Sequence, residues 1–353
     1  MGQYDVPVTR YWRIAALLAS VGIAAATGIS VARPAGHVHS PAAAIRSASA
    51  SASSPAPALF EPSYGPSGAK FEPPDGRVYL GVSTDIDRLG VFERAAGITT
   101  HPAIYNQYTR PDGPFSPTLA NAASVPGMTP MVSWNLPLTD GAVVSGARDD
   151  YLRAQARVVK AFDKPVFIRP DWEMNSTWSP GWDPPLVPPS AYIAAWRHVY
   201  EVFQSEGVLN AAFVWCVNTW PGPDHTDTSA WYPGDMFVDW IGVDGYPQSA
   251  STDYLMDSQD GLNPLASFAA AHRKPLMLAE WAPDLPKPDT AAAMDLIFDW
   301  AAAHPRTVKA LVYFDFTVGA KDFTLLDHPG GAAEFRRRTA SGPEYPDTVP
   351  GAR

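Results

Sequence analysis

Eight short apolar runs follow one another along the chain, and this repetition limits the possible folds more than any other feature of the sequence. Each run is rich in β-branched or aromatic residues, as strands buried in a parallel sheet are. The runs cover residues 78–82, 101–105, 129–134, 166–169, 211–217, 238–243, 275–279 and 310–314. We expect each run to form a strand.

Helical periodicity lies between several of these runs. In one segment the apolar residues share a helical face that follows Ser190, a candidate N-cap, and precedes Gly207, a candidate terminator. The members of this face are Tyr192, Trp196, Val199 and Phe203. Strand and helix in alternation, eight times over, predict an α/β fold of the (β/α)8 TIM-barrel type. An open doubly wound sheet is the competing fold, but it usually has fewer strands, and the chain lacks a nucleotide-binding fingerprint.

The chain that precedes these runs has a different composition. An apolar stretch from 14 to 32 follows Arg10 and Arg13, so residues 1–32 are predicted to be a signal peptide or a signal anchor. Residues 33–70 are rich in Ala, Ser and Pro and are predicted to form a disordered linker. The barrel domain is expected over 71–345 and a tail over 346–353. We therefore expect an exported protein, either secreted or held by a single anchor at the extracellular side of the cell membrane.

Charge and cysteine content exclude several classes of partner. The net charge is −10, from 26 basic and 36 acidic residues, which argues against binding to nucleic acid. Cys216 is the single cysteine, and it lies in an apolar run, so a buried inert thiol is expected. Because no zinc-type spacing and no Gly-rich phosphate loop occur, no metal and no organic cofactor are expected. We expect a monomer.

Two glutamates stand where strands end. Glu173 follows the fourth run and Glu280 ends the seventh. Active sites of (β/α)8 barrels gather at the carboxyl ends of the strands, so both carboxylates are expected in one cleft. Cleavage of a glycosidic bond needs two such groups, which in a retaining enzyme lie about 5 Å apart. The pair therefore predicts glycosidase chemistry on a polysaccharide or oligosaccharide substrate.

Aromatic and polar residues near the same strand ends support a carbohydrate site. Sugar rings stack their C–H faces on aromatic side chains, so Trp134, Trp172 and Trp281 are candidate substrate contacts. Some tryptophans of this group are expected to serve in packing instead. Arg169 is a candidate substrate contact and a candidate partner for a carboxylate, and Asn218 is a candidate ligand for a sugar hydroxyl.

Three segments also resemble glycoside hydrolase family 26, whose members are mostly β-mannanases. They are residues 169–178 (RPDWEMNSTW), 232–246 (YPGDMFVDWIGVDGY) and 274–281 (KPLMLAEW). The resemblance implies that Glu173 is the acid/base and Glu280 the nucleophile of a retaining endo-β-glycosidase. It also implies that Tyr246 orients the nucleophile and that Trp178 stacks near the scissile sugar.

The sequence departs from the family pattern at one position beside the acid/base. The family usually has histidine there, whereas this chain has Trp172. The substrate is therefore expected to be a β-mannan, another β-glycan or a cell-envelope polysaccharide. Two alternatives are a non-catalytic carbohydrate-binding barrel and an envelope structural protein. Carboxyl groups more than about 12 Å apart, beyond even inverting geometry, would indicate the structural protein.

Overall fold

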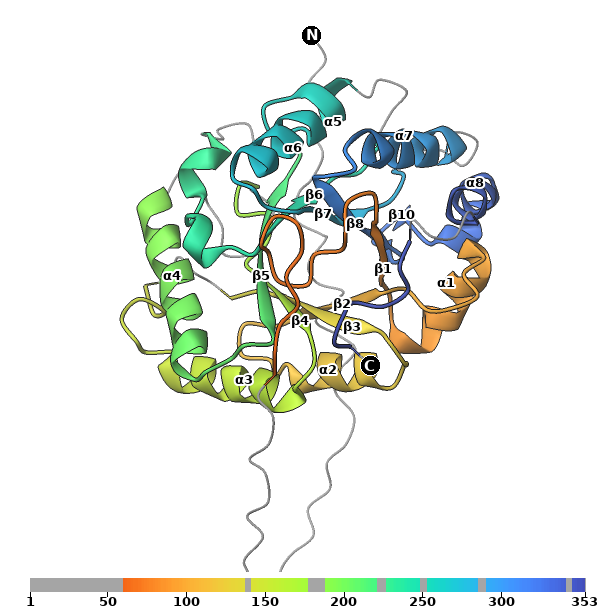
Figure 1. Ribbon diagram of the computed structural model, residues 1–353. Coiled ribbons are helices and arrows are strands. Elements are labelled where there is room, and N and C mark those ends of the chain that lie inside the picture. The colour runs from red at the N-terminus through yellow and green to blue at the C-terminus, as the bar shows by residue number, and fades with distance from the viewer. Residues whose placement is uncertain are drawn as a thin grey trace, which may run out of the picture. The chain divides into compact units, whose positions relative to one another are not determined.

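The computed structural model describes residues 60–136, 141–176, 188–220, 227–247, 253–284, 290–340 and 345–352. Eight parallel strands form a closed barrel in the order of the chain, from β1 to β8. Strand β1 pairs with β8, from Tyr79 opposite Ala310 to Ser83 opposite Phe314, and this pairing closes the ring. The strands lie at the centre and the helices surround them (Figure 1). The predicted TIM barrel is confirmed, and the open doubly wound sheet is excluded.

The observed strands lie close to the eight predicted runs. They are β1 (Tyr79–Ser83), β2 (Ile104–Thr109), β3 (Thr129–Trp134), β4 (Val166–Pro170), β5 (Ala211–Asn218), β6 (Trp240–Asp244), β7 (Leu276–Trp281) and β8 (Val308–Phe314). The largest difference is at β2, which continues through the polar residues Asn106 and Gln107. An apolar pattern cannot predict this extension, because Asn106 is a polar residue that the barrel buries. A short antiparallel hairpin of β9 (Thr317–Val318) and β10 (Lys321–Asp322) follows β8.

The helices are α1 (Leu89–Ala96), α2 (Ser116–Ala123), α3 (Asp149–Phe162), α4 (Pro189–Ser205), α5 (Asp253–Asp257), α6 (Leu262–Ala271), α7 (Thr290–Ala303) and α8 (Pro329–Thr339). All four predicted apolar positions of α4 are buried. Gly207 follows the helix with φ 71°, a left-handed conformation that favours glycine after a helix. The predicted cap Ser190 is wrong: Pro188 is the N-cap, and Ser190 lies in the first turn. Pro189 occupies the first helical position, where proline is well suited because its nitrogen has no hydrogen to leave unbonded.

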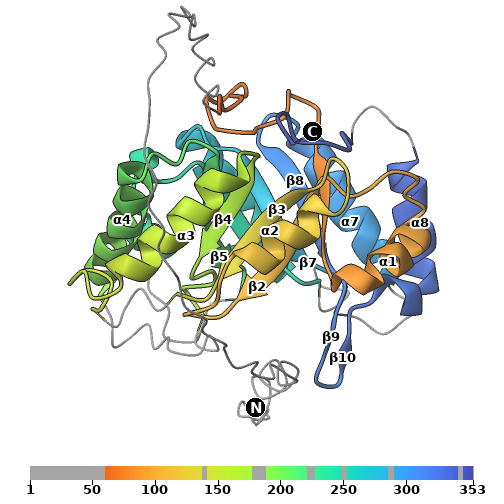
Figure 2. The same cartoon turned by 90° about the horizontal axis from the view of Figure 1, so that it is seen from below.

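The amino-terminal end of the barrel is covered by both ends of the described domain. Lys70 donates from Nζ to the carbonyl oxygen of Ala211 at 2.8 Å, and its own carbonyl accepts from Trp240 Nε1 at 2.7 Å. Phe71 and, from the predicted tail, Val349 are buried in the same apolar cluster. In Figure 2 the carboxyl terminus and the segment that begins at residue 60 lie at one end of the barrel. The β9–β10 hairpin lies at the other end. Residues 60–70 are thus part of the domain, and the predicted linker boundary moves toward the amino terminus.

Within the described residues, none of the helices is both long and apolar enough to cross a lipid bilayer. The predicted amino-terminal apolar segment (1–32) and residues 33–59 of the predicted linker lie outside the described residues.

Candidate active site

Glu173 reaches the barrel mouth through an unusual turn of the chain after β4. Both Asp171 and Glu173 have positive φ, at 46° and 58°. Two backbone hydrogen bonds hold the turn: the Asp171 amide donates to Trp134 at 2.7 Å, and the Glu173 amide donates to Cys216 at 3.0 Å. A left-handed conformation is unfavourable for a non-glycine residue by about 1–3 kcal/mol, and residues in such conformations cluster at functional sites. The bonds to β3 and β5 offset this energy and fix where the Glu173 side chain begins.

The Glu173 side chain is held from the end of β5. Asn218 Nδ2 donates to Glu173 Oε1 at 2.7 Å. Asn218 is fixed in turn by Asn175, which donates to the Asn218 carbonyl at 2.8 Å and accepts from the Asn218 amide at 2.8 Å. Asn218 was predicted as a sugar ligand, and in the structure its amide nitrogen is engaged with the carboxyl group of Glu173.

The environment of Glu173 favours the protonated carboxyl group. Burial, followed by the negative charge of Glu280, raises the pKa of Glu173 to about 8. The bond from Asn218 and the charge of Arg169 act in the opposite direction and are weaker. The raised pKa follows the usual effect of desolvation and a like charge on a carboxyl group.

Glu280 lies at the end of β7, where the pairing with β6 is irregular. Between Val243 and Asp244 the register shifts, so that Asp244 is opposite Glu280. Both carboxylate oxygens of Glu280 have a partner. Arg169 donates to Oε1, and the Tyr246 hydroxyl donates to Oε2 at 2.8 Å. The carboxylate is therefore oriented from both sides.

Arg169 is the centre of a hydrogen-bonded chain that crosses the barrel interior. Asn106 donates to Ser83 Oγ at 2.8 Å and accepts from Ser133 Oγ at 2.6 Å. Ser133 Oγ then accepts from Arg169 Nε at 2.8 Å. Arg169 also donates to the two oxygens of Asp244 at 2.9 and 3.0 Å. The hydrogen bonds link β1, β2, β3, β4 and β6, and they orient the guanidinium.

These contacts correct the prediction that Arg169 binds substrate. Its side chain is fully buried, and its donors are directed to protein groups. A guanidinium in this position offsets negative charge from two buried carboxyl groups and holds both groups in place. The predicted pairing with a carboxylate is confirmed. Cys216 is buried as expected, and burial raises the pKa of its thiol.

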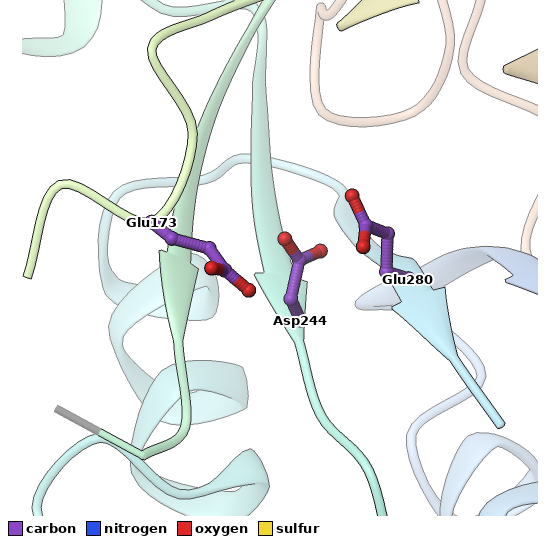
Figure 3. Close-up of side chains that lie close together, drawn as sticks. All are labelled: Glu173, Asp244 and Glu280. Carbon is purple, nitrogen blue, oxygen red and sulfur yellow. The ribbon is translucent and has the colours of Figure 1, made fainter. Parts of the chain in front are cut away.

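Three carboxylates meet at the mouth. One oxygen each of Glu173, Asp244 and Glu280 lie within 4.8 Å of one another. Figure 3 shows them converging from the segment after β4 and from the ends of β6 and β7, with Asp244 between the two glutamates. Hard cations take six or more oxygen ligands, and here Arg169 already supplies positive charge to two of the three groups. The donor set fits a site for proton transfer and attack on carbon better than a resident metal site.

Trp134 and Trp281 were predicted to contact substrate, and the structure contradicts both predictions. Each is fully buried on the helix-facing side of the barrel. Trp134 lies edge-on to Phe115 with ring centroids 4.9 Å apart, and Trp281 lies 5.2 Å from Tyr313. Successive residues of a strand face opposite sides. Because Ser133 and Glu280 point into the barrel, the tryptophans that follow them point out.

Trp172 is half-buried at the mouth and remains a candidate substrate contact. Its ring lies 5.3 Å from the Arg169 guanidinium carbon and 5.4 Å from the ring of Tyr108. Trp178 lies outside the described residues. Tyr246 holds Glu280, in the role that the resemblance implies for it.

An aromatic wall at the mouth was missed. Tyr108, at the end of β2, lies 6.3 Å from both Phe314 and Phe316, and Phe314 lies 5.8 Å from Tyr246. Tyr108 is 37% exposed. The two-residue alternation of the observed β2 puts Tyr108 on the same face as the buried Asn106. The aromatic wall consists of Tyr108 on β2 with Phe314 and Phe316 at and after the end of β8, and it lies on the Glu280 side of the mouth.

Comparison with known proteins identifies the family of the chain and agrees with its fold. The glycosyl hydrolase family 26 model matches residues 135–318, just over half of the chain. Endoglucanase H of Acetivibrio thermocellus is 31% identical over 147 residues, which are 40% of this chain and 16% of that protein. The β-1,3-xylanase TXYA of Vibrio sp. is 27% identical over 224 residues, which are 60% of this chain and 45% of that protein. The chain thus spans less than half the length of these two relatives.

Solved structures show the same fold. The modular endo-β-1,4-mannanase of Cellulomonas fimi superimposes with a TM-score of 0.60 at 17% identity, covering 79% of this chain and 74% of that chain. The YdhT protein of Bacillus subtilis has a TM-score of 0.57 at 16% identity, covering 78% and 88%. The protein belongs to glycosyl hydrolase family 26.

Proposed function

We propose that the protein is a retaining endo-β-glycosidase in which Glu280 is the nucleophile and Glu173 the acid/base. The observation that carries this proposal is the spacing of the two carboxylates, since one oxygen of Glu173 lies within 4.8 Å of one oxygen of Glu280. Retaining glycosidases have carboxyl groups about 5–5.5 Å apart, whereas inverting enzymes leave about 6.5–9.5 Å for a water molecule. The spacing also argues against the envelope structural protein, for which a wide separation was expected.

The surroundings of the two glutamates suit these different roles. Glu173 has a raised pKa and therefore holds a proton near neutral pH. It gives this proton to the leaving oxygen while a Glu280 oxygen attacks the anomeric carbon. Glu173 then removes a proton from the water that releases the sugar from Glu280. Arg169 and Tyr246 orient Glu280 and balance its charge before the attack and after its release.

The substrate class we propose is a β-linked polysaccharide. Relatives carry the names endoglucanase, β-1,3-xylanase and mannan endo-1,4-β-mannosidase, and each of these names refers to a polysaccharide substrate. The mouth offers aromatic side chains from three strands or their following turns, namely Tyr108, Trp172 and Phe314, which suit the C–H faces of sugar rings.

We further propose that the protein acts as a monomer and that it is exported, either secreted or anchored at the extracellular side of the membrane. Export is proposed because basic residues precede an apolar amino-terminal stretch.

The test is release of reducing sugar from a panel of mannans, glucans, β-1,3- and β-1,4-xylans and envelope glycans. We expect at least one β-glycan to be cleaved internally, and the first product to keep the anomeric configuration of the substrate when followed by proton NMR. Product of inverted configuration would show that Glu280 does not act as a nucleophile. Binding of a glycan without any cleavage would favour the non-catalytic barrel.

We expect activity to fall at alkaline pH. The first step needs protonated Glu173, whose pKa of about 8 is set by burial and then by the charge of Glu280. The value of kcat/KM should therefore stay level near neutral pH and drop about tenfold for each pH unit above 8. Replacement Asn218→Leu removes a donor that lowers this pKa and should move the drop to higher pH. An alkaline limit that Asn218→Leu leaves in place would mean that Glu173 does not determine it.

A further inference from the structure

Two aromatic rings at the rim of the barrel are exposed side by side. Trp220 is 45% exposed and Tyr254 is 43% exposed. Their ring centroids lie 4.4 Å apart, with planes inclined at 48°. Most other aromatic side chains of the described domain are buried or partly buried. Neither ring takes part in the reaction steps derived above.

The backbone of Trp220 is tied to the proposed acid/base. Trp220 lies two residues after β5, and its amide donates to Asn218 Oδ1 at 2.7 Å. The other end of the same Asn218 side chain donates to Glu173 at 2.7 Å. The Trp220 ring therefore lies on the same short segment as Asn218, the residue that donates to Glu173.

Tyr254 is fixed in the same region by its neighbour Leu255 on α5. Leu255 is buried, and a Cβ added at Gly245, just after β6, would lie 3.1 Å from Leu255 Cδ1 and 3.3 Å from Thr219 Cγ2. The glycine thus lets α5 approach the ends of β5 and β6. Tyr254 precedes Leu255 and Trp220 follows Thr219 in the chain. The close approach of Leu255 and Thr219 therefore brings the rings of Tyr254 and Trp220 together.

The position around the ring of strands gives these aromatic residues a direction relative to the scissile bond. In the closed barrel, β5 and β6 lie across from β1 and β2. Tyr108, on β2, and Phe314, on β8, form the aromatic wall near Glu280, whereas Trp220 and Tyr254 lie on the side of Glu173. A sugar chain that crosses the mouth along this line contacts both groups. The acid/base stands beside the departing part of the substrate, because it protonates the leaving oxygen.

We propose that Trp220 and Tyr254 form a sugar-stacking platform for the leaving segment of a β-glycan chain, beyond the scissile bond. This inference rests on the proposed retaining glycosidase. The exposed faces of the two rings bind the apolar C–H face of a pyranose ring. The platform favours long substrates, whose leaving segment reaches it, over short ones, whose leaving group does not.

The test compares two substrates of the wild-type enzyme and its variants. One is a hexasaccharide of the β-glycan that the wild-type enzyme cleaves, and the other is the matching nitrophenyl glycoside, whose leaving group is too small to reach the rim. Trp220→Ala removes the ring but keeps the backbone amide that bonds to Asn218. We expect kcat/KM for the hexasaccharide to fall about tenfold in Trp220→Ala and less in Tyr254→Ala, with the nitrophenyl glycoside unaffected. Tyr64→Ala, which removes a 63% exposed ring at the other end of the barrel, is the matched control and should change neither.

Equal losses on both substrates would show that Trp220 only supports Glu173, and no loss on either would show that the rings do not bind sugar. A binding measurement tests the platform independently of the reaction. In the Glu280→Gln background, calorimetry with the hexasaccharide should show about tenfold weaker binding when Trp220→Ala is added. This result would support the platform even if the wild-type protein cleaved nothing, in which case polysaccharide-derived hexasaccharides of the panel serve as ligands. Absence of binding to all of them, or binding that Trp220→Ala leaves unchanged, overturns the platform.

Discussion

Glu280→Gln is expected to lower kcat on a cleaved β-glycan by on the order of 10⁴-fold or more, with little change in KM. The amide cannot form the covalent link to the anomeric carbon, and no other described carboxylate has the same freedom to attack. Asp244, the nearest acidic neighbour, accepts two hydrogen bonds from Arg169 and one from Cys216, so it is committed to bracing the site. Turnover is measured by steady-state release of reducing sugar.

The control for this variant is Glu334→Gln, which removes a carboxylate from an ion-pair cluster on α8 and should leave kcat unchanged. Glutamine is nearly isosteric with Glu280, and Arg169 keeps its two hydrogen bonds to Asp244, so the variant is expected to fold. Its far-UV circular dichroism and melting temperature verify this. Addition of azide to the smaller variant Glu280→Gly should restore cleavage of an activated aryl glycoside and yield a product of inverted configuration. Turnover near the wild-type value in Glu280→Gln would remove Glu280 from the mechanism.

The barrel and its two glutamates could be predicted because both depend on local patterns. Each buried parallel strand is a short apolar run, and the carboxyl ends of such strands meet at one mouth. Glu173 and Glu280 follow two of these runs, so topology alone brings them together across 107 positions of sequence. The proximity of their oxygens in the structure is the consequence.

The errors at Trp134 and Trp281 were avoidable from the same sequence. Proximity to a strand end does not decide which face of the strand a side chain occupies, but the two-residue alternation does. Once Glu280 is taken to face the mouth, its successor must face the helices. Tyr108 could not be placed in this way, because the predicted run ends at residue 105 and β2 continues to Thr109 through polar residues.

The role of Arg169 could not be read from its neighbours in sequence. Its carboxylate partners Asp244 and Glu280 lie 75 and 111 residues further along the chain. The register shift between β6 and β7, which sets Glu280 opposite Asp244, is likewise a property of strand pairing rather than of either strand. A buried arginine with three or more protein acceptors is recognised only when the whole barrel is closed.

Glu173→Gln is expected to lower kcat on a β-glycan by about 10²–10⁴-fold, the range that general acid catalysis supplies. The size of the loss should depend on the leaving group. A sugar alcohol leaves poorly without a proton, so its cleavage needs Glu173. A dinitrophenolate leaves without protonation, so formation of the glycosyl enzyme from a dinitrophenyl glycoside should be nearly unaffected in the variant. The burst of dinitrophenolate measures this first step, and the slow phase that follows measures the impaired release by water.

Azide needs no general base, so it should accelerate the slow phase in Glu173→Gln and give a glycosyl azide of retained configuration.

The Glu173→Gln variant should also be more stable than the wild type at alkaline pH. The folded protein holds the Glu173 proton up to a pH of about 8, whereas a glutamate in the unfolded chain releases it near 4.5. Between these values the folded state binds more protons, so stability of the wild type falls as pH rises, and an uncharged glutamine removes this dependence. We expect the melting temperature of Glu173→Gln to exceed that of the wild type by a few degrees at pH 8.5 and to differ little at pH 4. If both substrates slow equally and the two melting curves coincide at pH 8.5, Glu173 is neither the acid/base nor a group with a raised pKa.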